Sequence, residues 1–211
     1  MSELERWNQR FSAPGYLFGA GPNRFLASKR DFLKRGQSAL CVADGDGRNS
    51  VWLAEQGLEV TAFDFSPVAV AKARRLAAER GVRVRYDVAG VYDWAWPQEE
   101  AFDVVAAIFV QFADPAMREF MFARIVRALK PGGLLLLEGY TPKQLEYRTG
   151  GPSQVENLYT APLLREAFHD LEILELREYE AELEEGERHA GRSALIDLVA
   201  RARSPAQPAA R

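Results

Sequence analysis

The chain alternates short apolar runs with longer stretches in which apolar residues recur at helical spacing. Short runs of Val, Ile, Leu and Ala predict strands, and the run 104–108 is nearly continuous, as expected of a strand buried on both faces. This alternation is typical of an α/β fold, in which helices cover a parallel sheet. The predicted strands span residues 39–43, 59–63, 82–86, 104–108, 134–137, 178–183 and 194–200.

Helix starts are marked by Ser66-Pro67 and Asp114-Pro115. Each pair joins a capping side chain to a proline suited to the first helical position. The predicted helices lie within residues 51–57, 66–81, 114–131 and 161–168.

Two segments lack a clear apolar core pattern. Residues 140–159 contain several Pro and Gly, and loops of this length are usually functional or disordered. The glutamates between 172 and 187 are expected to form a solvated face rather than to supply an acid catalyst.

Length and composition indicate one domain. The chain has 211 residues, of which 47% are hydrophobic, enough for one substantial core. We expect this domain to span residues 1–203, with 204–211 as a flexible tail. The longest apolar run, 104–110, is far shorter than the roughly 20 residues of a membrane span, and the start of the chain lacks an apolar signal core, so a cytoplasmic protein without membrane contact is expected.

Charge and metal-ligating residues exclude several classes of partner. One cysteine, Cys41, forbids an internal disulfide, and two histidines leave little for a metal centre, so no metal is expected. A net charge of -3 gives no electrostatic footprint for a nucleic acid. The expected partner is a small molecule, and the sequence does not indicate an oligomeric state.

Glycines follow the first predicted strand, and an acidic residue ends the second. Open parallel sheets bind ligands at the carboxyl ends of their strands, beside the point where the strand order reverses. Gly45 and Gly47 would let a ligand approach the backbone, and Asp64, about 20 positions on, is placed to accept both ribose hydroxyls of a nucleoside. The same residues also fit a plain tight turn followed by a helix cap.

The charge of this loop favours one adenosine ligand over another. Residues 45–50 depart from the dinucleotide-binding pattern at Ser50, where the third glycine usually stands. A pyrophosphate would lie against Asp44 and Asp46, and two like charges about 4 Å apart repel by roughly 4 kcal/mol at an effective dielectric of about 20. S-adenosylmethionine has no phosphate and carries two cationic groups that carboxylates attract. The loop therefore favours S-adenosylmethionine, although the spacing alone leaves both ligands open.

Residues at later strand ends extend this site. Asp87 is placed to accept a hydrogen bond from the adenine amino group, with Val88 beside it, and Ile108 and Phe109 would wall the methionine moiety. The alternatives are an ordinary turn aspartate and plain core packing. The full cofactor-binding set is Ala43, Asp44, Gly45, Gly47, Asn49, Asp64, Phe65, Asp87, Val88, Ile108 and Phe109.

The combination of motifs is similar to a known family. The residues that carry the similarity are Ala43-Asp44-Gly45-Asp46-Gly47-Arg48-Asn49-Ser50, Asp64, Asp87 and Lys130-Pro131-Gly132-Gly133, together with Trp7-Asn8, Arg10-Phe11, Tyr16, Phe18-Gly19 and Pro22-Asn23. They resemble class I S-adenosylmethionine-dependent methyltransferases, and the N-terminal residues more closely resemble the bacterial tellurite-resistance and thiopurine-methyltransferase-like branch. The resemblance covers residues 7–202. It implies a doubly wound, seven-stranded, mostly parallel sheet in the order 3-2-1-4-5-7-6, with the last strand antiparallel and helices on both faces.

The chain departs from the family pattern at two positions. Ala43 stands where the family usually has its first glycine, and Cys41 stands where many members have an acidic residue. Asp44 is expected to take over part of that acidic role, and Cys41 is expected to be a small buried hydrophobe.

An acceptor pocket needs cover from water. Residues 1–28 interleave aromatic residues with glycines and prolines, so this N-terminal segment is the expected lid, although a permanently packed segment fits the same pattern. The family's strand order places the turn at residues 184–191 at the same edge. The acceptor-pocket candidates are Tyr16, Phe18, Gln111, Tyr140, Tyr147 and His189.

We expect methyl transfer from S-adenosylmethionine to a small-molecule acceptor, with no catalytic residue assigned. Family similarity favours tellurite, a thiol or another soft nucleophile, which would need little help from a general base. The segment after the fourth strand, 108–111, lacks the motif of enzymes that methylate base amines. The alternatives are an NAD(P)-dependent oxidoreductase on the same sheet and a noncatalytic S-adenosylmethionine sensor.

Overall fold

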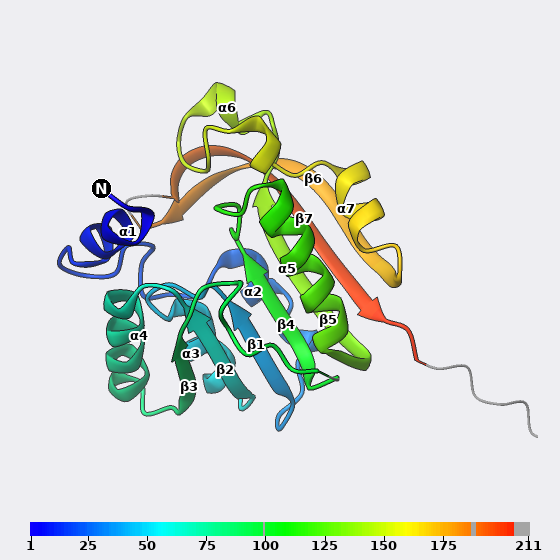
Figure 1. Ribbon diagram of the computed structural model, residues 1–211, viewed down its shortest axis with the longest axis horizontal. Helices are drawn as coiled ribbons and strands as arrows, with labels where there is room; N and C mark the ends of the chain where they lie inside the picture. The colour runs from blue at the N-terminus through cyan, green and yellow to red at the C-terminus, as the bar shows by residue number, and fades with distance from the viewer. Residues whose placement is uncertain (99, 187–188, 205–211) are drawn as a thin grey trace, which may run out of the picture.

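The computed structural model describes residues 1–98, 100–186 and 189–204, which contain one seven-stranded sheet (Figure 1). The strand order is β3-β2-β1-β4-β5-β7-β6, so the predicted order is confirmed. The strands are β1 (Ser38–Val42), β2 (Glu59–Asp64), β3 (Val84–Val88), β4 (Phe102–Ile108), β5 (Leu129–Tyr140), β6 (Leu171–Glu185) and β7 (His189–Ala202). The helices are α1 (Glu3–Phe11), α2 (Arg24–Ser28), α3 (Arg48–Glu55), α4 (Pro67–Glu79), α5 (Pro115–Ala128), α6 (Gln144–Tyr147) and α7 (Ala161–Ala167), with short 3-10 turns at Arg30–Phe32 and Val155–Asn157.

The first five strands are parallel, and β7 is antiparallel to both β5 and β6. Successive side chains of a strand point to opposite faces, so Leu134 and Leu136 join one apolar cluster while Leu135 and Leu137 join the other. The first cluster includes residues of α2, α3 and α4, and the second includes residues of α5 and α7. Helices therefore cover both faces of the sheet, as predicted (Figure 1).

The predicted helix caps are confirmed. The Ser66 hydroxyl accepts the backbone N–H of Ala69, and the Asp114 carboxylate accepts that of Met117. Each cap precedes a proline at the start of its helix, so the first turn is fixed by a side-chain acceptor and a preset φ angle.

Two predicted strand boundaries are wrong. The third strand begins at Val84 rather than at 82, because the backbone N–H of Val82 donates to the Ala77 carbonyl and closes the end of α4. The fifth strand begins at Leu129 rather than at 134, so Pro131-Gly132-Gly133 lies inside β5. The pairing of β4 with β5 shifts register between Phe102 and Val104, and such irregularities accommodate proline and glycine in a strand.

The C-terminal part is more ordered than the sequence indicates. The loop 140–159 contains α6 and a 3-10 turn, and β6 and β7 extend well beyond the predicted 178–183 and 194–200. β6 continues to Glu185, so the turn predicted over 184–191 is shorter. The predicted tail from residue 205 onward lies outside the described residues.

An aromatic cluster after β3 was not predicted. The ring of Trp94 stacks on Phe63 at 4.5 Å, and Trp96 meets both rings edge-on at 5.5 Å and 4.9 Å. This cluster packs the connection between β3 and β4 against the sheet. No helix among the described residues is both long enough and apolar enough to cross a bilayer.

Candidate functional site

Two residues at neighbouring strand ends have left-handed backbone conformations. Ala43 follows β1 with φ 48°, and Phe109 follows β4 with φ 54°. This region costs an L-residue roughly 1–2 kcal/mol, and such strain is concentrated at functional sites. Because β1 and β4 are adjacent at the reversal of strand order, both residues flank the place where open parallel sheets bind ligands.

The two glycines of the loop after β1 face different neighbours. Gly47 caps α3 with φ 97°, and a Cβ there would lie 2.7 Å from the Ala73 Cα on α4. Packing of α3 against α4 therefore accounts for Gly47. A Cβ at Gly45 would lie 3.4 Å from the ring of Phe11, so Gly45 faces the N-terminal segment.

Asp64 joins the glycine loop to the start of α4. One carboxylate oxygen accepts the backbone N–H of Gly45 and the other accepts that of Ser66, both at 2.9 Å. The residue is 5% exposed, and burial raises the pKa of its carboxyl to about 6 although both backbone donors lower it. A carboxylate has about four acceptor positions, so two positions are left for a pair of hydroxyls.

Asp44 binds side chains inside the protein. It accepts hydrogen bonds from the hydroxyl and the backbone N–H of Ser50, and Ser50 in turn lies 2.9 Å from the Tyr86 hydroxyl. Burial raises the pKa of Asp44 to about 7, and the Cys41 side chain, which is buried, hydrogen-bonds to it. Asp44 thus lies beside the position where the family pattern has its acidic residue, and its carboxylate is engaged inside the protein.

Asp46 and Arg48 bind the N-terminal segment. An Asp46 carboxylate oxygen accepts the Leu17 N–H at 2.8 Å, and the Arg48 guanidinium donates to the Phe18 carbonyl at 3.0 Å. Arg48 also forms a buried ion pair of 2.8 Å with Glu185 at the end of β6. The expectation that Asp46 simply repels phosphate is incomplete, because burial raises its pKa and its carboxylate has an internal partner.

Asn49 anchors the far end of the N-terminal segment. Its side-chain oxygen accepts the Asn23 N–H at 2.9 Å, and the Asn23 amide group donates to Glu138 at 2.5 Å and to Glu185 at 3.3 Å. The Asn23 oxygen caps α2 through the Leu26 N–H. α2 is therefore fixed to β5, β6 and α3 at once.

Glu138 was missed by the sequence analysis. It ends the apolar run of β5, as Asp64 ends β2 and Asp87 ends β3, and that position was the available signal. Tyr179 donates to Glu138 or to Asp197, each at 3.2 Å. Burial and the charges of Asp197 and Glu185 raise the pKa of Glu138 well above its usual range.

Glu185 corrects the expectation of a uniformly solvated glutamate face. It is buried and binds Arg48 and the backbone N–H of Arg24. Its neighbours Glu182 and Glu184 are exposed, so only part of the acidic run meets solvent.

The predicted adenine-side residues lie at the end of β3. One Asp87 oxygen accepts the Trp94 indole N–H at 3.0 Å, and the other lies 3.9 Å from the Arg85 guanidinium. Val88 is exposed, and Phe65, a predicted cofactor-binding residue that follows β2, is half-buried.

Two predicted methionine-wall residues and two predicted acceptor residues lie at the ends of β4 and β5. The rings of Phe109 and Tyr140 lie 4.7 Å apart, whereas Ile108 is half-buried and packs with another apolar cluster. The Gln111 amide accepts the Tyr140 N–H at 2.6 Å and donates to the Tyr140 carbonyl at 2.9 Å and to Asn157 at 3.1 Å. Gln111 therefore positions the backbone of Tyr140.

The other acceptor candidates are more dispersed. Phe18 packs edge-on against Phe11 at 6.4 Å, whereas the Tyr16 hydroxyl lies 3.4 Å from the Glu79 carboxylate of α4. The Tyr147 hydroxyl donates to Glu180 on the exposed outer part of β6. The His189 side chain lies outside the described part of the chain.

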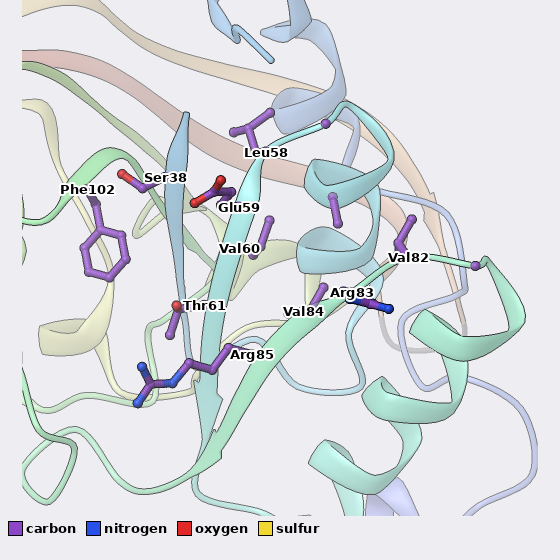
Figure 2. A pocket seen from close by; sticks show the side chains of 13 residues that line it. Ser38, Leu58, Glu59, Val60, Thr61, Val82, Arg83, Val84, Arg85 and Phe102 are labelled. Atoms are coloured by element: carbon purple, nitrogen blue, oxygen red, sulfur yellow. The ribbon is translucent and has the colours of Figure 1, made fainter. Parts of the chain in front are cut away.

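A hollow of about 770 Å³ lies at the opposite edge of the sheet, along the amino ends of β1, β2 and β3 (Figure 2). Its lining includes Ser38, Thr61 and Arg85, which Figure 2 shows on adjacent strands. It shares no residue with the predicted cofactor site. Within the described residues, no group of three His, Cys, Asp or Glu side chains is arranged to hold a metal ion.

The residues at the carboxyl edge fit an adenosine cofactor with cationic groups. Asp64 has acceptor positions for two ribose hydroxyls, and Asp87 has an oxygen that its indole donor does not use. The loop 43–49 brings backbone groups between them. The N-terminal segment, however, lies directly on this loop, because Phe11 contacts Gly45.

Part of the chain is similar to known proteins. Residues 39–133 match a family model described as a methyltransferase domain. A ubiquinone biosynthesis O-methyltransferase from Xanthomonas euvesicatoria is 38% identical over 108 residues, which cover 48% of this chain and 42% of that protein. The match thus spans less than half of this curated relative's length.

Solved structures share the fold. A SAM-dependent methyltransferase from Methanosarcina mazei has a TM-score of 0.71 at 19% identity, covering 88% of this chain and 100% of its own. TehB from Haemophilus influenzae has a TM-score of 0.68 at 16% identity, covering 84% of this chain and 61% of its own. Similarity at this identity shows the fold alone, so the expected tellurite-resistance branch stays a prediction. Residues 39–133 are thus similar to a methyltransferase domain, and the solved structures share the fold of the whole sheet.

Proposed function

We propose that the chain is an S-adenosylmethionine-dependent methyltransferase that acts on a small-molecule acceptor. The observation that carries this proposal is the match of residues 39–133 to a methyltransferase domain, in which the Gly45 N–H and the Asp64 carboxylate meet at the carboxyl edge. When bound, S-adenosylmethionine supplies an electrophilic methyl group on a cationic sulfur. A cytoplasmic location is a further prediction.

The chain's own residues would bind and orient the cofactor. Asp64 would accept the ribose hydroxyls, Asp87 would accept the adenine amino group, and the loop 43–49 would meet the methionine end, with Ile108 and Phe109 as its wall. The carboxylates at these strand ends favour a cation over a pyrophosphate. Asp44 contributes little to this preference, because its raised pKa of about 7 leaves it partly neutral at physiological pH.

The remaining contribution of the protein would be alignment in a dry site. Methyl transfer needs the nucleophile in line with the methyl group at about 3–3.5 Å, and exclusion of water strengthens every electrostatic contact in the site. Phe11 and Phe18 would supply apolar cover from within the segment 1–28, where their rings pack edge-on.

For the acceptor, we favour a small hydroxylated aromatic molecule. The curated relative reported above is named for ubiquinone biosynthesis, and Phe109 and Tyr140 pack two rings together beside the cofactor loop. Aromatic rings pack well against other rings in offset or tilted arrangements. Tellurite and thiols are the alternative acceptors, which the family resemblance predicts.

Two other functions fit the sheet less well. An NAD(P)-dependent oxidoreductase would place a pyrophosphate against Asp46 and would not account for the methyltransferase-domain match. A noncatalytic sensor would bind S-adenosylmethionine without turnover, and only an activity assay separates it from an enzyme.

Calorimetric titration with S-adenosylhomocysteine and with NADH tests the cofactor. We expect S-adenosylhomocysteine to bind and Asp64→Ala to weaken it at least tenfold, because two hydrogen bonds to a charged acceptor are lost. Tight NADH binding, or unchanged affinity in Asp64→Ala, would contradict the assignment. Methyl transfer from labelled S-adenosylmethionine to catechols, hydroquinones, thiols and tellurite then tests the acceptor. Binding without transfer to any of them would support the sensor.

A further inference from the structure

The N-terminal segment is held by side chains of the cofactor loop and of α4. The Lys72 ammonium donates to the carbonyls of Ala13 at 2.5 Å and Gly15 at 2.6 Å. Asp46 and Arg48 bind the backbone of the same segment a few residues further on. Lys72, Asp46 and Arg48 thus hold the backbone of the segment.

α1 lies over the two groups that bind Asp64. Gly45 and Ser66 donate their backbone N–H groups to the Asp64 carboxylate. The Phe11 ring is 2% exposed and would lie 3.4 Å from a Cβ at Gly45, and the Ser66 hydroxyl donates to the Asn8 side chain at 2.6 Å. α1 thus lies beside both residues whose backbone N–H groups bind the Asp64 carboxylate.

This cover conflicts with cofactor entry. A ribose that reaches Asp64 must come within hydrogen-bond distance of a carboxylate that is almost fully buried, and a ring already occupies the space beside Gly45. Departure of α1 from the loop would open a path for the ribose to Asp64.

The far end of the segment is buried and hydrogen-bonded to the sheet and to α3. Asn23 is fully buried and is held by Asn49 and Glu138. Between the two ends, Gly19 has φ 78° and packs on Gly186, where a Cβ would lie 2.6 Å from the Gly19 nitrogen. A hinge at Gly19 would move residues 3–18 and leave α2 in place.

Resting on the proposed function, we propose that residues 3–18 form a gate that closes over the cofactor site, with Lys72 and Asp46 as its latch and Phe11 as the group that excludes the ribose. Lys72 and Asp46 are positioning residues in this proposal, because they act on the cofactor site through the gate. Cofactor binding then proceeds by selection of the open form.

Stopped-flow fluorescence with S-adenosylhomocysteine tests the gate. Trp7 stacks on Phe11 at 5.6 Å, so gate opening changes its emission, and the Trp7→Phe variant identifies that signal. For the wild type we expect the observed rate to reach a plateau at high ligand concentration, set by gate opening. In Lys72→Ala the plateau rate should rise roughly tenfold, because two hydrogen bonds from a charged group to the segment are lost. Lys34→Ala removes an exposed lysine elsewhere and should leave the rate unchanged.

Phe11→Ala supplies a second measurement should Lys72→Ala fold poorly. It removes the ring beside Gly45, and the plateau should rise or disappear. A rate that increases linearly with ligand in the wild type and is identical in both variants overturns the gate. Failure of S-adenosylhomocysteine to bind the wild type and both variants at equilibrium overturns the proposed function itself, so the two failures are distinguishable.

Discussion

Arg48 and Glu185 form an ion pair of 2.8 Å whose side chains are only 5% and 4% exposed. It connects the first turn of α3 to the end of β6, and Glu185 also binds the N-terminal segment through Arg24. Glu185→Gln should lower the free energy of unfolding by about 3–5 kcal/mol, because it leaves a buried guanidinium without a counter-charge.

Urea unfolding measures this loss, and Glu180→Gln is the control. Glu180 pairs with Arg192 and Lys143 on the solvent-exposed side of β6, so its loss should cost much less than the loss of Glu185. Equal effects of the two substitutions would contradict the stabilising role of the buried Arg48–Glu185 ion pair.

Ala43 has a backbone conformation that suits glycine better than alanine. Ala43→Gly should raise the free energy of unfolding by about 0.5 kcal/mol, because relief of roughly 1–2 kcal/mol of strain exceeds the entropic cost of glycine. Ala39→Gly in β1, which has no such conformation, should be destabilising. Thermal unfolding of both variants tests this expectation. If Ala43→Gly is destabilised, packing of the Ala43 methyl group contributes more stability than the backbone strain removes.

Gly47→Ala tests the close approach of α3 to α4. Its Cβ would lie 2.7 Å from two atoms of Ala73, in addition to the left-handed φ, so we expect a loss of more than about 2 kcal/mol. Gly81→Ala has a comparable φ of 68° with no atom within 4 Å, and it should cost only the roughly 1–2 kcal/mol of backbone strain. The difference between the two variants in urea unfolding isolates the steric part.

The sheet was predictable because its signals are local or belong to the family. Apolar runs mark each strand, and Ser66 and Asp114 mark helix starts through their own capping bonds. The strand order came from the resemblance and not from the residue pattern. The start of β5 was predicted wrongly, because Pro131-Gly132-Gly133 usually ends a helix or forms a turn. Here a register shift in the pairing with β4 accommodates these residues inside the strand.

The site was less predictable, because its side chains bind residues that are distant in the sequence. Asp64 was found from its position at a strand end, but the sequence does not indicate that Asp46 and Arg48 bind the backbone of residues 17–18. Glu138 was overlooked because its partners lie 115 positions before it in the chain, at Asn23, and on later strands. Long-range polar contacts of this kind leave no periodic trace in a single sequence.

The raised pKa of Asp44 makes its contribution to stability depend on pH. The folded carboxyl binds its proton more tightly, with a pKa of about 7 against an ordinary value of 3.8, because it is buried. Its contribution is therefore full below pH about 4 and is lost as the pH rises through about 7. Asp44→Asn stays neutral throughout and keeps a hydrogen-bonding group beside Ser50. The free energy of unfolding of this variant relative to the wild type should thus increase by at least about 1 kcal/mol between pH 5 and pH 8. Urea titrations at both pH values measure that difference, and a constant difference would mean that Asp44 is ionised throughout.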